Sequence, residues 1–134
     1  MFFIECPFCH QQVFRLWYSF HTARHTALLD DGQMTDHITM AEHERYLGPL
    51  DGVPQVYYHP LCEGETGMPE EIIRSYLANP FLYNDRTFCT GCNDYVLESE
   101  VFWTETGQSL AEYKEQLQQA YIQRHGQPPP RPHV

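Results

Sequence analysis

Three short stretches decide how this chain folds: Cys6-Pro7-Phe8-Cys9, His59-Pro60-Leu61-Cys62 and Cys89-Thr90-Gly91-Cys92. Each contains two side chains that can bind zinc, separated by two residues. This spacing lets one tight backbone turn direct both donor atoms to a single ion, as structural zinc sites require. Because one tetrahedral zinc takes two such pairs, the chain has one pair more than a single site needs.

The sequence leaves open which of these turns share an ion. Turns 59–62 and 89–92 enclose the shortest loop and so have the smallest closure entropy, whereas turns 6–9 and 89–92 would join two similar hairpins. Turns 6–9 and 59–62 are the third option, ranked just behind the other two. The candidate Zn²⁺ ligands are Cys6, Cys9, His59, Cys62, Cys89 and Cys92. Four protein ligands leave no open position on the ion, which favours a structural role over catalysis.

Two histidines after the first turn offer a further arrangement. Cys6, Cys9, His21 and His25 have the spacing C-x2-C-x11-H-x3-H, one residue short of the usual two-Cys two-His finger. A finger needs a helix that carries both histidines, with apolar residues at fixed offsets before it, and the aromatic residues here do not match those offsets. We therefore expect exposed polar histidines, although either one, or a carboxylate, would complete a second zinc site around the remaining pair.

The composition fits one folded domain with a protein partner. The chain has 134 residues, with 14% aromatic and 19% charged residues, which is not the composition of a disordered protein. The formal net charge is −10, and the eight Lys and Arg are scattered without a basic run. The negative field of such a protein disfavours nucleic acid as a partner, so we expect another protein.

The use of cysteine indicates a reducing compartment. Residues 1–4 are apolar, but Glu5 and Cys6 follow at once, so we expect no signal peptide. No stretch approaches the length of a transmembrane helix. We therefore expect a cytoplasmic protein whose five cysteines bind metal rather than form disulfides.

The regular elements are expected around these turns. Strands are predicted over 1–5, 13–18, 55–58, 86–88, 95–97 and 101–103, and a loop over 63–67. One helix begins at Pro69 and ends before Asn79-Pro80, and the last runs from the capping box Ser109-x-x-Glu112 to Gly126. Segment 35–46, rich in His and carboxylates, is expected to be a solvated loop or a short helix that begins near Thr39.

Together these elements predict an α+β fold, with small antiparallel zinc-knuckle β-hairpins and two amphipathic helices packed on them. A single zinc-stapled domain would span 1–126, and residues 127–134, with four prolines, would form a flexible tail. The predicted core is Phe14, Trp17, Ile72, Tyr76, Val101, Trp103, Leu110, Tyr113 and Leu117. The candidates for contact with a partner are Tyr57, Tyr58, Phe81 and Tyr83.

The strand–Cys-x-x-Cys–strand units resemble the knuckles of zinc-ribbon and rubredoxin-like proteins. This resemblance implies a structural zinc and a role in binding proteins or nucleic acids. The stretch 84–93, NDRTFCTGCN, is similar to the end of the HNH nuclease pattern. That second resemblance implies a metal-binding Asp36, a general base His37 and an active-site Asn84, with turns 6–9 and 89–92 sharing the structural zinc.

We therefore expect a small intracellular protein with a structural zinc site that acts as a protein-interaction module. The alternatives are an HNH-like metal-dependent nuclease and a purely structural subunit of a larger assembly.

Overall fold

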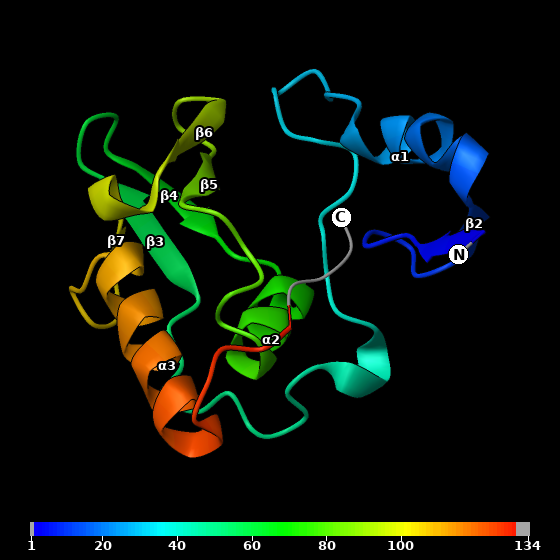
Figure 1. Cartoon of the computed structure of the whole chain (residues 1–134). Helices are drawn as coiled ribbons and strands as arrows, with labels where there is room; N and C mark the ends of the chain where they lie inside the picture. Colours follow the sequence, from blue (N-terminus) through cyan, green and yellow to red (C-terminus); the bar gives the residue numbers. More distant parts are fainter. Residues whose placement is uncertain (1, 131–134) are drawn as a thin grey trace.

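The computed structural model describes residues 2–130, and these form three α-helices and several small antiparallel sheets (Figure 1). The α+β class expected from the sequence is confirmed. The helices are α1 (Tyr18–Thr26), α2 (Glu70–Ala78) and α3 (Leu110–His125). The strands are β1 (Phe3–Glu5), β2 (Gln12–Phe14), β3 (Val56–His59), β4 (Gly64–Gly67), β5 (Arg86–Cys89), β6 (Asp94–Leu97) and β7 (Phe102–Trp103). Short 3-10 helices cover Arg15–Trp17, Glu42–Glu44 and Glu98–Glu100.

The three metal-competent turns share one backbone conformation. Each connects the two strands of an antiparallel hairpin: β1–β2, β3–β4 and β5–β6. The residue after the second donor is left-handed in all three, with φ of 62° at His10, 58° at Glu63 and 54° at Asn93. The expected loop over 63–67 is therefore wrong, because β4 pairs there with β3. The second turn is a knuckle like the other two.

The buried core lies where the sheet β4–β3–β7 meets α2 and α3. Its members are Tyr57, Ile73, Tyr76, Val101, Trp103 and Leu110, with Ile72, Tyr113 and Leu117 partly buried against them. Most of the predicted core is thus in place. Phe14 and Trp17 are the exceptions, because Phe14 lies in β2 outside this core and Trp17 lies in a 3-10 helix with 61% of its surface exposed.

The ends of α2 and α3 follow the local signals in the sequence. Pro69 precedes α2, and Glu70 and Glu71 occupy its first turn. The Ser109 hydroxyl accepts a hydrogen bond from the Glu112 N–H at the start of α3, and Gly126 ends it with φ of 80°.

One predicted strand and one predicted helix cap differ from expectation. The strand predicted over 13–18 ends at Phe14, and the chain then turns into α1. Segment 35–46 holds only the 3-10 helix Glu42–Glu44, which begins after Ala41 without a side-chain cap. Thr39 is buried instead of capping a helix. In both cases tertiary contacts override a weak local preference.

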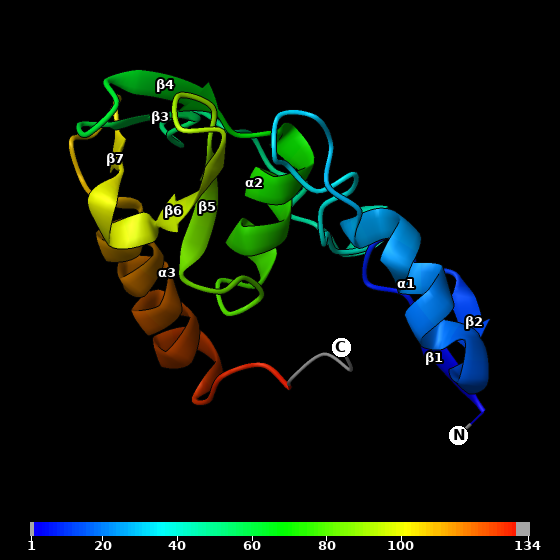
Figure 2. The ribbon, with the colours of Figure 1, turned by 90° about the horizontal axis from the view of Figure 1, so that it is seen from above.

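The N-terminal unit (residues 2–26: β1, β2 and α1) lies to one side of the sheets and helices formed by 56–125 (Figures 1 and 2). Segment 27–55 links the two parts, and the Thr39 N–H donates to the Pro7 carbonyl at 3.3 Å. Across residues 2–130, none of the helices combines the length and apolar character needed to cross a bilayer. The predicted flexible tail, 127–134, lies partly outside the described residues.

Candidate metal centres

The second and third knuckles bring four donors together. His59 and Cys62 come from the β3–β4 turn, and Cys89 and Cys92 from the β5–β6 turn. The Sγ atoms of Cys62 and Cys89 are 3.4 Å apart, and His59 Nδ1 lies 3.6 Å from Cys89 Sγ and 3.4 Å from Cys92 Sγ. Tetrahedral zinc bonds of about 2.3 Å to sulfur and 2.0–2.1 Å to nitrogen require separations of about 3.5–3.8 Å. This C-terminal cluster has nearly those dimensions.

The surroundings of the C-terminal cluster lower the pKa of one thiol and raise that of another. The Gly64 N–H, 3.4 Å from the Cys62 sulfur, lowers the pKa of that thiol to about 7. Burial, together with the neighbouring thiols, raises the pKa of Cys92. Several thiolates in one cluster repel each other, and a divalent cation among them would remove that repulsion.

Two glycines allow the second and third knuckles to approach each other. A Cβ added at Gly91 would lie 2.5 Å from the Cys62 sulfur, and one at Gly64 would lie 2.9 Å from the Gly91 Cα. The small residue between Cys89 and Cys92 is thus required by the packing of one knuckle on the other.

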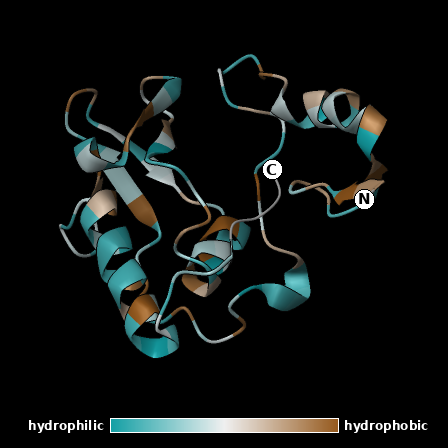
Figure 3. Ribbon diagram, in the orientation of Figure 1, coloured by the Kyte–Doolittle hydropathy of each residue, from teal (hydrophilic) through white to brown (hydrophobic). Residues whose placement is uncertain are grey.

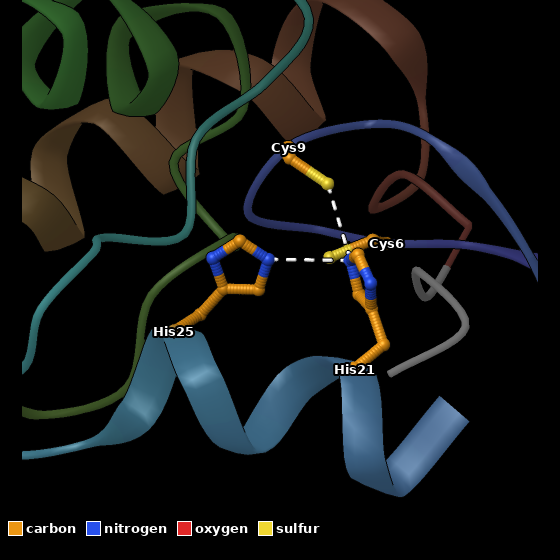
Figure 4. A group of neighbouring side chains, drawn as sticks. All are labelled: Cys6, Cys9, His21 and His25. Carbon is orange, nitrogen blue, oxygen red and sulfur yellow. Dashed lines mark hydrogen bonds between the residues drawn. The ribbon is translucent and has the colours of Figure 1, made fainter. Parts of the chain in front are cut away.

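The first knuckle forms a second cluster with α1 (Figure 4). Cys6 and Cys9 come from the β1–β2 turn, and His21 and His25 point toward them from one face of the helix, as a four-residue spacing dictates. The His21 Nε2 lies 3.3 Å from the Cys9 sulfur and 3.2 Å from the His25 Nε2. All four donor atoms of this N-terminal cluster lie within 4.8 Å of one another.

Neighbouring side chains orient the two histidines. Asp36 Oδ2 is 2.8 Å from His25 Nδ1, which places the proton on that nitrogen and leaves Nε2 to face the cluster. Phe8, between the two cysteines, stacks on the His25 ring at 5.0 Å. Desolvation, with Arg24 and His25 nearby, lowers the pKa of His21. Arg24 donates to His21 Nδ1 at 3.0 Å. If His21 bound a metal through Nε2, its proton would lie on Nδ1, which could then no longer accept this hydrogen bond.

The structure chooses among the pairings that the sequence left open. Turns 59–62 and 89–92 come together, whereas turns 6–9 and 89–92 lie in separate clusters. The expectation that His21 and His25 are exposed polar residues is wrong, because both are half-buried against the cysteines. Loop length is the sequence signal that could have identified both histidines as ligands. Eleven residues, 10–20, separate Cys9 from His21, whereas 26 residues, 63–88, separate turns 59–62 and 89–92. The shorter loop has the smaller closure entropy.

The arrangement expected for an HNH nuclease is not present among residues 2–130. Neither Asp36 nor His37 belongs to a group of His, Cys, Asp and Glu side chains able to hold a metal there. Asp36 contacts His25, and the Asn84 side chain accepts the Arg86 N–H at 3.0 Å. The four cysteines that the resemblance would gather around one zinc are divided between two clusters.

Residues 2–130 thus contain two Cys/His clusters that could hold a metal ion, each with four protein donors. Metal binding by the six residues singled out from the sequence stays a prediction. Comparisons of the chain with protein-family models, curated proteins and solved structures found no match.

Proposed function

We propose that this chain is a small zinc-binding protein that holds two structural Zn²⁺ ions and uses its N-terminal unit to bind another protein. The observation that carries the proposal is the convergence of four donors in each of two clusters, each built from two separate segments of the chain. Thiolate and imidazole are the ligands that zinc prefers, and sets of three Cys with one His and of two Cys with two His are characteristic of closed structural sites.

The N-terminal unit supports the partner part of the proposal. Five of its large apolar residues are exposed, and we call them the N-terminal apolar surface: Phe2, Phe3, Leu16, Trp17 and Phe20, which are 58–74% exposed. Trp17 and Phe20 pack on each other at 6.2 Å, so part of this surface is continuous. The start of α1 and the β1–β2 hairpin are accordingly the hydrophobic parts of this unit in Figure 3. Exposed apolar groups of this kind mark interaction sites in proteins.

The part of the chain that carries this surface differs in net charge from the rest of the protein. Residues 1–29 contain Arg15, Arg24 and Glu5 as their only Arg, Lys, Asp or Glu, for a formal charge of +1 in a chain of −10. The remainder therefore carries −11. An apolar, nearly neutral surface on a strongly acidic molecule suits a protein partner, and the same surface would serve the alternative role of a subunit in a larger assembly.

The N-terminal cluster would couple zinc to this surface. Cys6 and Cys9 belong to the β1–β2 turn, and His21 and His25 to the helix that carries Phe20. Helix α1 has no buried residue and no side-chain cap. An ion bound between the hairpin and α1 would thus supply the cross-link that fixes the surface.

Metal content measured by native mass spectrometry tests the zinc proposal. The full chain should carry two zinc ions, and Cys9→Ser and Cys89→Ser should each carry one. A metal-free chain that unfolds cooperatively with a chelator present would refute it.

The partner proposal is tested by quantitative capture from cell extract with the zinc-loaded protein. Trp17→Ser/Phe20→Ser should lose a specific partner that wild type and Leu47→Ser retain, since Leu47 is 74% exposed but outside the N-terminal apolar surface. Equal capture by all three proteins would refute it.

A further inference from the structure

The N-terminal unit has almost no core of its own. Among residues 2–26, only Cys6 and Val13 are buried, and Cys6 is itself a candidate ligand. The hydrophobic core of the protein and the apolar side chains packed against it all lie within residues 50–117. Chains shorter than about 40 residues usually need a metal, a disulfide or a partner to fold. We therefore expect the contacts within this unit to be too few to hold it folded by themselves.

The N-terminal unit also gains little from the rest of the protein. It lies to one side of the sheets and helices of residues 56–125 in Figure 2. A hollow of about 630 Å³ is lined both by Phe3 of the β1–β2 hairpin and by Leu82, which follows α2, so the two parts are not closely packed there. The Thr39 N–H that meets the Pro7 carbonyl belongs to the linking segment 27–55. The core therefore does little to fix the first knuckle.

Helix α1 adds little stability of its own. It has nine residues, no side-chain cap and no buried residue. Isolated helices shorter than about 12–15 residues are marginal in water. Because His21 and His25 lie on α1, two of the four donors of the N-terminal cluster depend on a helix that local contacts do not hold.

The C-terminal cluster has a different frame. The Thr90 N–H donates to the Thr66 hydroxyl at 3.1 Å, and the Thr90 hydroxyl donates to the Glu65 carbonyl at 2.9 Å. The hydroxyl of Tyr57, a core residue in β3, donates to the Phe88 carbonyl at 2.5 Å in β5. These hydrogen bonds join the second knuckle to the third beside the donors. Protein contacts thus hold the four donors of this cluster near one another.

This difference predicts unequal zinc affinities. Where metal binding must also order the site, part of the binding free energy is spent on folding. The apparent affinity then falls in proportion to the fraction of molecules in the competent conformation, so a unit folded in about one molecule in ten binds about tenfold more weakly. The donor sets act in the same direction, because three thiolates and one imidazole present more negative charge to the cation than two of each.

We propose that the N-terminal unit is a zinc-responsive switch. This inference rests on the proposed function and adds an order of filling: the C-terminal cluster fills first, and residues 2–26 become ordered only when the second ion binds. Trp17 directly precedes α1 and Phe20 lies within it, so the N-terminal apolar surface forms only at the higher zinc concentration. Binding of the protein partner then follows the supply of zinc.

Hydrogen–deuterium exchange of the full chain, in solutions that buffer free zinc, tests the order of filling, while native mass spectrometry counts the bound ions. With one ion bound, the amides of α3 should be protected and those of α1 should exchange freely. Protection of α1 should appear only with the second ion, at a free zinc concentration at least about tenfold higher. Protection of α1 with one ion or none, or filling of both clusters at the same zinc concentration, would overturn the switch.

A helix variant tests whether α1 folds as the ion binds. Ala23 is exposed on α1 and is not a candidate ligand. Ala23→Gly should weaken zinc binding at the N-terminal cluster about four- to fivefold, because glycine opposes the helix that the ion must stabilise. Ala120→Gly, at an exposed alanine of α3, is the matched control and should leave the affinity of this cluster unchanged. Competition with a chromogenic chelator measures both variants.

The outcomes separate this inference from the proposed function. An unchanged affinity in Ala23→Gly would show that α1 is formed before zinc binds, which refutes the switch and leaves two structural zinc sites intact. Two ions of equal affinity would have the same meaning. A chain that binds no zinc would refute the proposed function, and the switch with it.

Discussion

The contact between the second and third knuckles predicts the effect of a single methyl group. Gly91→Ala would place a Cβ 2.5 Å from the Cys62 sulfur and 3.2 Å from the Gly64 Cα. A carbon needs about 3.5–4.0 Å from a non-bonded atom, so one knuckle must move by about 1 Å. The backbone of Gly64 and a metal-competent sulfur are the obstacles, and neither is the free end of a flexible side chain.

The size of the effect follows from the cost of overpacking. Inserting a methyl group into a packed site costs about 1–3 kcal/mol, which corresponds to a fall in zinc affinity of about 5- to 150-fold at the C-terminal cluster. The N-terminal cluster does not contact Gly91 and should keep wild-type affinity. The measurement is competition for zinc with a chromogenic chelator, which resolves one weakened and one normal site per chain.

Gly67→Ala is the matched control for this experiment. Gly67 lies in β4, the strand of the β3–β4 hairpin that also contains Gly64. A Cβ at Gly67 would meet nothing within 4 Å, so zinc affinity should be unchanged. Two zinc ions bound by Gly91→Ala with wild-type affinity would show that the knuckles do not pack as described.

Three further predictions concern single side chains. Cys9→Ser should lose zinc at the N-terminal cluster alone, with digestion by protease increasing in α1 and not in α3; an equal increase in both helices would contradict two separate sites. Ser109→Ala removes the cap that accepts the Glu112 N–H, so the free energy of unfolding should fall by about 1 kcal/mol in thermal melts of the zinc-loaded chain, and an unchanged stability would argue against this cap. Burial acts to raise the pKa of Glu105, but hydrogen bonds from the Gln55 and Val56 N–H groups and the Thr104 hydroxyl outweigh it, so the folded-state pKa is lowered below 4.5. This carboxylate therefore stabilises the fold above pH 4.5, and the stability advantage of wild type over Glu105→Gln should shrink as pH falls through the folded-state pKa; an advantage that does not change with pH would contradict this.

The number of donors explains why the sequence seemed to have one metal-binding pair too many. Each hairpin contributes two donors, and three hairpins give six, which does not fill two four-donor sites. Helix α1 supplies the missing pair through His21 and His25. The N-terminal cluster therefore joins a hairpin to a helix, whereas the C-terminal cluster joins two hairpins.

Local signals in the sequence determined much of the C-terminal part of this protein. Pro69 with two acidic residues fixed the start of α2, and Ser109 and Gly126 fixed the ends of α3. These features act within one helical turn, so they can be recognised without the rest of the chain. The pairing of turns 59–62 and 89–92 was among those favoured because loop closure depends only on the distance along the chain.

Tertiary structure alone decided the N-terminal part of the chain. Residues 18–26 have no side-chain cap and no buried residue, so nothing local distinguishes a helix from the exposed segment expected there. The helix is recognised only when His21 and His25 are seen against Cys6 and Cys9.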